Sequence, residues 1–363
     1  MKKAISLVLS LTLLLSLITG CAGTPVVYYS NCSCPPAAHE SAPAPTTPSE
    51  STPSAPAVVP SEGAVKTGLA IMTSVAKSEN AAHADYDITL AAVTVDDKGV
   101  ILSCALDSIG TKVTFDANGA VTSDLSAEIL SKNELGENYG MKAYAGSKYE
   151  WNEQAAAVAQ FAVGKTVEEF RSGAVNEAGK APEGTDLATT ATIYIGGYVS
   201  AIEAAVNNAK HLGAMAGDEL KMVAISSISD STSATAEKAG LAQLYTEVAA
   251  LTENNGVITS CYFDAVQAKV NFDTAGVITS DITAPVQTKN ELGENYGMKA
   301  WGGAIAEWDE QAASFAKYVT GKTASEVAGI AVSETTAPTE ADLVSSVTIK
   351  IGGFMDLIAK AMK

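Results

Sequence analysis

The sequence predicts an α+β protein with two tandem homologous domains, each a small antiparallel sheet packed with helices, after a signal peptide and a disordered tether. One observation is an exact repeat, because KNELGENYGMKA occurs at 132–143 and again at 289–300. The others are two periodicities. Apolar and polar residues alternate before each motif, as in strands, and apolar residues recur at about every third or fourth position after it, as in helices.

The first segment, residues 1–20, is predicted to be a lipoprotein signal peptide. Lys2 and Lys3 precede an apolar run that is shorter than the roughly 20 residues of a membrane-spanning helix. The run ends in Ile18-Thr19-Gly20-Cys21, which resembles a bacterial lipobox. This resemblance implies that Cys21 is lipidated and anchors the protein to the extracellular face of the cell membrane; secretion without an anchor is the alternative.

Residues 21–63 hold the lipidated Cys21 and a stretch rich in Pro, Ser and Thr. A stretch of this composition cannot bury enough apolar surface to fold, so it is predicted to be a solvated tether. At about 3.1 Å per residue when extended, the tether spans on the order of 100 Å.

The net charge of −18, with only 23 Lys and Arg residues, argues against a nucleic-acid partner. Binding to nucleic acid requires concentrated positive charge, and no basic cluster follows Lys3.

The cysteines after the anchor fall into two groups. Cys32 and Cys34 lie in the tether, where a metal site lacks further ligands and oxidation is the favoured interpretation. Cys104 and Cys261 end the matching runs GVILSC and GVITSC. They are predicted to be buried core thiols, with an interdomain disulfide as the alternative.

A shift of 157 residues, from 132 to 289, aligns more than the twelve-residue motif. EWNEQAA at 150–156 meets EWDEQAA at 307–313, and GKT at 164–166 meets GKT at 321–323. A repeat of this length indicates a duplicated domain. We place copy 1 at 64–212 and copy 2 at 213–363, and expect each to fold by itself.

Each copy is predicted to contain the same elements in the same order. The strands of copy 1 are separated by the turn sequences DDKG and DANG, to which ENNG and DTAG correspond in copy 2. EWNEQAAAVAQFAVG and EWDEQAASFAKYVTG are predicted to be amphipathic helices that stop at glycine. A short helix opened by Thr follows in each copy, and a final helix begins at Gly-Gly.

The histidines of this sequence offer little basis for catalysis. His39 lies in the tether, His83 has no counterpart in copy 2, and His211 lies between the copies, so no base is repeated. Zinc or iron held by histidine is disfavoured for the same reason. GKT lacks the earlier glycine of a phosphate loop and is better explained as a helix stop followed by a Thr cap.

Paired carboxylates leave a lectin or glycoside hydrolase open as a minor alternative, although aromatic residues make up only 6% of the chain. The candidates for such a pair in copy 1, each with a counterpart in copy 2, are Glu134, Glu137, Glu150 and Glu153.

A shared segment near the end of each copy carries the functional prediction. DLATTAT at 186–192 meets DLVSSVT at 342–348. Both resemble the flavinylation segment of the FMN-binding domain family, commonly Asp-x-x-Ser/Thr-Gly-Ala-Thr. The resemblance implies FMN in phosphoester linkage to the last Thr, installed from FAD by a flavin transferase. The residues it assigns to the two sites are Asp186, Thr189, Ala191 and Thr192, and Asp342, Ser345 and Thr348.

Three residues depart from the family pattern. Thr190 and Ser346 stand where the family usually has Gly, and Val347 stands where it has Ala. Because copy 2 departs further, we expect the first site to fill at least as fully as the second.

The repeated motif offers contacts for a flavin ring. Tyr139 and Met141 in copy 1, and Tyr296 and Met298 in copy 2, provide an aromatic face and a polarizable side chain. Trp151 and Trp308 are candidates for a second face. Core packing is the alternative explanation for all of these residues.

The lipobox, the tether and the two copies together resemble the pheromone-precursor type of flavin lipoprotein in Gram-positive extracellular electron transfer. This resemblance implies an electron carrier without a substrate of its own, relaying electrons from a membrane quinol-linked donor to extracellular acceptors. A cofactor-free solute-binding or adhesion lipoprotein is one alternative, and an extracellular hydrolase is another.

Overall fold

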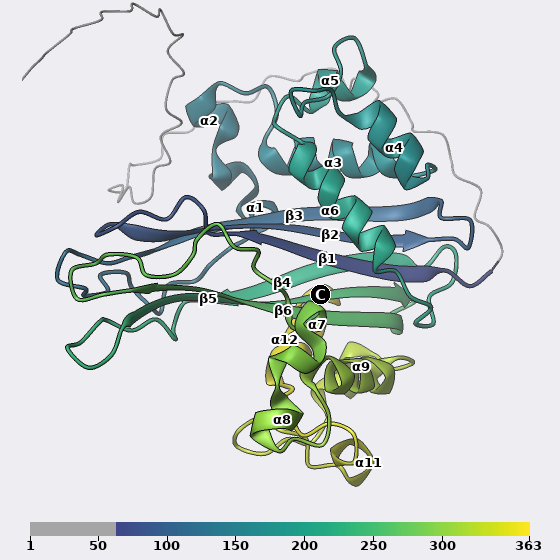
Figure 1. Cartoon of the computed structure of the whole chain (residues 1–363). Helices are drawn as coiled ribbons and strands as arrows, with labels where there is room; N and C mark the ends of the chain where they lie inside the picture. The colour runs from purple at the N-terminus through teal and green to yellow at the C-terminus, as the bar shows by residue number, and fades with distance from the viewer. Residues whose placement is uncertain (1–62) are drawn as a thin grey trace, which may run out of the picture. The chain divides into compact units, whose positions relative to one another are not determined.

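The computed structural model describes residues 63–363 (Figure 1). The predicted signal peptide, the lipidation of Cys21 and the interpretations of Cys32, Cys34 and His39 lie outside the described residues and stay predictions.

Copy 1 forms a three-stranded sheet followed by helices. Its elements are β1 (Lys66–Ser74), β2 (His83–Val95), β3 (Ile101–Thr114), α1 (Lys132–Leu135), η1 (Gly136–Tyr139), α2 (Met141–Ala145), α3 (Trp151–Ala162), α4 (Val167–Ala174), α5 (Asp186–Thr190) and α6 (Gly196–Asn207).

Copy 2 repeats this order element by element. Its elements are β4 (Glu219–Ser227), β5 (Gly240–Asn254), β6 (Val257–Phe272), α7 (Lys289–Leu292), η2 (Gly293–Tyr296), α8 (Met298–Gly302), α9 (Trp308–Val319), α10 (Ala324–Ala328), α11 (Ala341–Val344) and α12 (Gly352–Ala361).

Both sheets are antiparallel meanders with the orders β1-β2-β3 and β4-β5-β6. The α+β class and the two small antiparallel sheets predicted from the sequence are therefore confirmed. In the central strand β2, alternate residues face opposite sides: Ile88 and Leu90 join one apolar cluster, whereas Ala91 and Val93 join another. Burial on both faces favours the β-branched and small apolar residues that this strand contains.

The helices begin where the sequence indicates. Glu150 and Glu307 cap α3 and α9, and Thr166 and Thr323 cap α4 and α10, in each case with a capping box. A capping box satisfies backbone N–H groups that the first helical turn leaves without partners. GKT is thus a helix stop and a Thr cap, as predicted.

Each sheet packs its helices on one face and the other sheet on the opposite face. Figure 1 shows α3, α4 and α6 beyond one sheet, and α9 and α12 beyond the other. Between the sheets lies a single apolar cluster built from β1–β3 and β4–β6 together. Phe115 and Phe272 stack there with ring centroids 4.0 Å apart, and the hydroxyls of Thr67 and Ser260 hydrogen bond at 2.7 Å.

Each copy buries an apolar cluster between its sheet and its helices, and the two sheets share a third cluster. Only the cluster between a sheet and its helices belongs to one copy, and the cluster between the sheets needs both. Removing either copy would expose the inter-sheet face of the other to water. The structure therefore gives a physical reason against independent folding of residues 64–212.

Candidate functional site

The two threonines of the repeated segment have the same environment. In copy 1 the side-chain oxygen Oε1 of Gln154 accepts from Thr192 N at 2.8 Å, Thr192 Oγ1 at 3.1 Å and Ile193 N at 3.2 Å. Gln311 accepts from Thr348 N, Thr348 Oγ1 and Ile349 N at the same three distances. Both glutamines are fully buried, whereas both threonines are exposed. One buried amide thus fixes an accessible Thr in each copy.

The residues before each threonine form a short helix, α5 or α11. Asp186 and Asp342 lie exposed in its first turn. The hydroxyl of Thr189 donates to the Asp186 carbonyl oxygen at 2.7 Å, and that of Ser345 donates to the Asp342 carbonyl oxygen at 3.1 Å. The segment therefore begins with the same local turn in both copies.

Ala191 and Val347, the residues directly before the two threonines, are buried. Each side chain packs in the apolar cluster between its sheet and helices. The additional methyl groups of Val347 therefore fill the core rather than crowd the exposed Thr348.

The same two glutamines also contact the segment that contains the repeated motif. Gln154 Nε2 donates to the Tyr149 carbonyl oxygen at 3.0 Å and to Ser147 Oγ at 3.2 Å, and it lies 3.9 Å from Met141 Sδ. In copy 2, Gln311 Nε2 donates to the Ala306 carbonyl oxygen at 2.8 Å. In copy 1 the glutamine thus joins the repeated motif, through Met141, to the threonine segment, and in copy 2 it joins the segment after the motif, at Ala306, to the threonine segment.

A buried glutamate fixes the first turn of α2 and of α8. The Glu150 carboxylate accepts from Met141 N at 2.8 Å and from Lys142 N at 3.0 Å. Glu307 accepts from Met298 N and Lys299 N at the same distances. These carboxylates act as helix caps, which disfavours their use as a pair of glycosidase acids.

The start of the repeated motif is fixed against the sheet. Asn133 Nδ2 donates to the Leu106 carbonyl oxygen at 2.7 Å, and its backbone N–H donates to Asp107 Oδ1 at 3.1 Å. In copy 2, Asn290 makes the same contacts with Phe263 and Asp264. Burial raises the pKa of Asp107, and it raises that of Asp264 to about 6. These contacts, with the glutamate caps, explain why the motif tolerates little change.

The four side chains expected to touch a flavin ring pack against the protein. Tyr139 and Met141 lie half-buried against the copy 1 helical core, and Tyr296 and Met298 lie half-buried against that of copy 2. Tyr296 Oη also donates to Gln267 Oε1 at 3.3 Å. This placement favours core packing for these residues.

The tryptophans expected to supply a second face are buried. Trp151 Nε1 donates to Tyr198 Oη at 2.9 Å, and Trp308 meets Phe354 edge to face. The first lysine of each repeated motif lies beside the tryptophan and tyrosine rings: Lys132 Nζ is 5.3 Å from the Trp151 centroid, and Lys289 Nζ is 4.7 Å from that of Trp308. Both tryptophan rings are therefore too buried to provide a second contact surface for a flavin ring.

Two exposed aromatic residues were missed by the sequence interpretation. Tyr144 on α2 is 86% exposed, and Trp301 at the matching position on α8 is 83% exposed. Each ring lies over the glycine of the motif, because a Cβ added to Gly140 or Gly297 would come within 2.5 Å or 2.3 Å of it. Both glycines are left-handed, with φ of 81° and 82°. The signal available in the sequence was an aromatic residue directly after MKA in both copies.

The helix after each threonine begins with Gly-Gly and differs between copies. A Cβ on Gly197 in α6 would meet no atom within 4 Å, whereas one on Gly353 in α12 would overlap the carboxylate of Glu247. The helix N-terminus carries partial positive charge, which favours an anionic group such as a phosphate. In copy 2 a carboxylate already lies against this turn.

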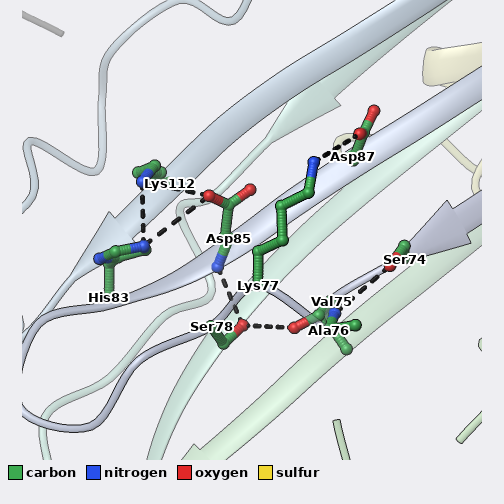
Figure 2. Close-up of polar contacts among 9 residues, drawn as sticks. All are labelled: Ser74, Val75, Ala76, Lys77, Ser78, His83, Asp85, Asp87 and Lys112. Carbon is green, nitrogen blue, oxygen red and sulfur yellow. Dashed lines mark hydrogen bonds and ion pairs between the residues drawn. The ribbon is translucent and has the colours of Figure 1, made fainter. Parts of the chain in front are cut away.

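His83 of copy 1 belongs to a cluster of polar and charged side chains on the sheet (Figure 2). His83 Nε2 lies 2.9 Å from Lys112 Nζ, and Asp85 lies 3.1 Å from Lys112 and 3.7 Å from His83. The nearby Ser78 hydroxyl donates to the Val75 carbonyl oxygen, so no histidine activates it. Copy 2 has Gln243 rather than an acid opposite its lysine, so the cluster is not repeated.

Cys104 and Cys261 are free thiols and no disulfide joins them; Cys261 is buried, as predicted, whereas Cys104 is only half-buried. Burial raises the pKa of the Cys104 thiol to about 12 and raises that of Cys261 as well. Neither thiol is therefore a reactive thiolate near neutral pH.

Within residues 63–363, no group of three or more His, Cys, Asp or Glu side chains is arranged to hold a metal ion. In the same range, no helix combines the length and hydropathy of a membrane span.

The chain matches no family model, no curated protein and no solved structure.

Proposed function

We propose that each copy carries one FMN in phosphoester linkage, on Thr192 in copy 1 and Thr348 in copy 2, and that the lipid-anchored protein relays electrons from a membrane quinol-linked donor to extracellular acceptors. The observation that carries this proposal is that the side-chain oxygens of Gln154 and Gln311 accept the same hydrogen bonds from an exposed threonine in the two copies. The same three hydrogen bonds occur in both copies although the sequences around them differ.

The residues present fit the attachment of such a group. Each Thr is an exposed residue that a flavin transferase can approach, and its backbone is fixed by a buried amide rather than left to loop motion. In the proposed modification Thr Oγ1 replaces AMP on the FMN phosphorus of FAD and gives up its proton, which the transferase accepts. Bound flavin supplies a centre that accepts two electrons and releases them singly.

The exported protein, produced together with a flavin transferase, tests this proposal by intact mass. The wild type should be yellow and exceed the apo chain by two FMN units less two waters. Thr192→Ala and Thr348→Ala should each remove one unit, and the double variant should remove both. Ser200→Ala is the matched control, because Ser200 is also exposed and lies on the helix after Thr192, where its hydroxyl donates locally to the Gly196 carbonyl oxygen.

A colourless wild type, or colour that survives the double substitution, would contradict the proposal. Either result would favour a cofactor-free solute-binding or adhesion lipoprotein.

The two sites should not fill equally. In copy 2 the Glu247 carboxylate lies against the first turn of α12, where it would repel a phosphate, whereas the matching turn of copy 1 is open. We therefore expect the mass spectrum at partial loading to show more Thr192 occupancy than Thr348 occupancy. Glu247→Gln should bring the two occupancies closer together.

A further inference from the structure

We infer that Tyr144 and Trp301 are the stacking surfaces for the flavin rings of copy 1 and copy 2. This inference rests on the proposed attachment at Thr192 and Thr348, and it replaces the half-buried tyrosines of the repeated motif as the ring contact.

Exposure and recurrence are the first argument. A ring that is more than four-fifths exposed is unusual for Tyr or Trp, which normally bury most of their surface. Tyr144 carries a hydroxyl and Trp301 an indole N–H, so their polar groups differ. What the two residues have in common is the flat π surface of the ring.

The support behind each ring is the second argument. Gly140 and Gly297 lie under the rings so closely that a Cβ would collide with them, which leaves the other face open to solvent. Tyr144 N donates to the Gly140 carbonyl oxygen at 2.9 Å, and Trp301 N donates to that of Gly297 at 3.0 Å. With the glutamate caps, the short helix holds its aromatic ring on a fixed backbone.

The connection to the threonine is the third argument. Gln154 accepts from Thr192 through Oε1, and its Nε2 contacts Met141 Sδ and Ser147 Oγ, which flank Tyr144 on both sides in the chain. Figure 1 shows α5 on the outer side of the copy 1 helices and α2 beside them, both on the helical side of the sheet. Gln154 therefore links the threonine that would carry the FMN to the segment that carries Tyr144.

Tyr194 is the competing surface in copy 1. It lies two residues after Thr192, is 63% exposed and covers Gly179. Copy 2 has Lys350 at this position, so only Tyr144 and Trp301 offer the same contact to both sites.

The test uses flavin fluorescence of the full-length loaded protein, because a phenol or indole ring in contact with a flavin quenches its emission. Thr348→Ala leaves only the first site loaded, and Thr192→Ala leaves only the second. In these backgrounds Tyr144→Ala and Trp301→Ala, respectively, should raise the emission per flavin several-fold. Tyr144→Phe and Trp301→Phe should also raise it, since phenylalanine does not quench, but should keep the visible circular dichroism of a bound flavin that the alanine variants lose.

Emission is normalised to flavin absorbance, so partial loading does not alter the reading, and intact mass confirms attachment in each variant. Normal loading with emission unchanged by Tyr144→Ala and Trp301→Ala overturns this inference and leaves the proposed function standing. A change caused in the first site by Tyr194→Ala instead of Tyr144→Ala also overturns it. Absence of FMN from the wild-type mass overturns the proposed function and the inference together.

Discussion

Copy 1 and copy 2 have the same hydrogen bonds at the threonine but differ in the packing around the first lysine of the repeated motif. The three hydrogen bonds to Gln154 and to Gln311 have the same lengths, and so do the two to Glu150 and to Glu307. The packing around the first lysine of the motif has changed, because Lys289 is buried among Tyr245, Tyr296 and Trp308, whereas Lys132 is only half-buried.

The comparison separates contacts that differ between the copies, which are interior packing contacts, from contacts that are the same in both, which are the hydrogen bonds of the glutamine. Interior packing tolerates exchange when volume is kept: Trp151–Tyr198 and Trp308–Phe354 both meet edge to face with centroids 5.7 Å apart, and only the first pair adds a hydrogen bond. A side chain that fixes one backbone segment by three hydrogen bonds has no such substitute. The following predictions test how far the likeness and the difference extend.

The largest effect should come from separating the copies. Residues 64–212 alone would expose the inter-sheet face of β1–β3, which includes Ile71, Ile88 and Phe115. Each such side chain contributes about 1.5–3 kcal/mol through burial, and a whole domain is stable by only about 5–15 kcal/mol. We expect no cooperative monomeric unfolding transition by circular dichroism, in contrast to residues 63–363. A homodimer would still fit a shared core; a cooperatively folded monomer would not.

The next effect concerns the buried lysine of copy 2. Burial lowers the pKa of Lys289 to about 8 from its ordinary 10.5, despite nearby Glu247 and Asp264. Between these two values the unfolded chain binds the proton that the folded chain has released. The free energy of unfolding should therefore rise with pH across this range, by up to about 3 kcal/mol.

Lys289→Met should remove this rise, and urea titrations at pH 7.5 and pH 10 measure it in both proteins. Lys317→Met, which removes an exposed lysine of α9, controls for the loss of one charge. An identical pH profile in the Lys289→Met variant and the wild type would show that the buried lysine is not the titrating group.

The matched glutamines should give matched losses. Gln154→Leu and Gln311→Leu each remove the acceptor of backbone N–H groups. The free energy of unfolding should fall by about 1–3 kcal/mol in each variant. Urea midpoints should fall by similar amounts, and FMN occupancy should fall at the threonine of the altered copy only. Gln160→Leu, on the exposed side of α3, is the control. A stability loss confined to one copy would break the equivalence of the two sites.

The smallest effect concerns one turn in which copy 2 has a non-glycine residue at positive φ and copy 1 has a glycine. Thr336 has a left-handed φ of 63°, and the corresponding Gly179 of copy 1 has a φ of 71°. This conformation is unfavourable for a β-branched residue and natural for glycine. Thr336→Gly should therefore stabilise the protein by up to about 1 kcal/mol. Thr335→Gly, next to it in ordinary conformation, should destabilise instead, and equal losses in both variants would argue against strain at Thr336.

Much of the fold was determined by the sequence, because local signals suffice for it. The exact repeat at 132–143 and 289–300 revealed the duplication, alternation revealed the strands, and the threonine of each GKT revealed the cap of the short helix that follows it. These features depend on neighbours in the chain, so they can be read without knowing what packs against them. The free state of Cys104 and Cys261 followed from the same apolar strand pattern.

The tertiary structure alone decided which surfaces meet. Periodicity shows that a strand has an apolar face but not that β1–β3 and β4–β6 cover each other, so the shared core was missed. The contact between Gln154 and Thr192 joins residues 38 apart in the chain, and no local pattern reports it. Whether Tyr139 or Tyr144 is exposed depends on the side chains and backbone around each ring, because burial is a property of the packed molecule and not of the residue type.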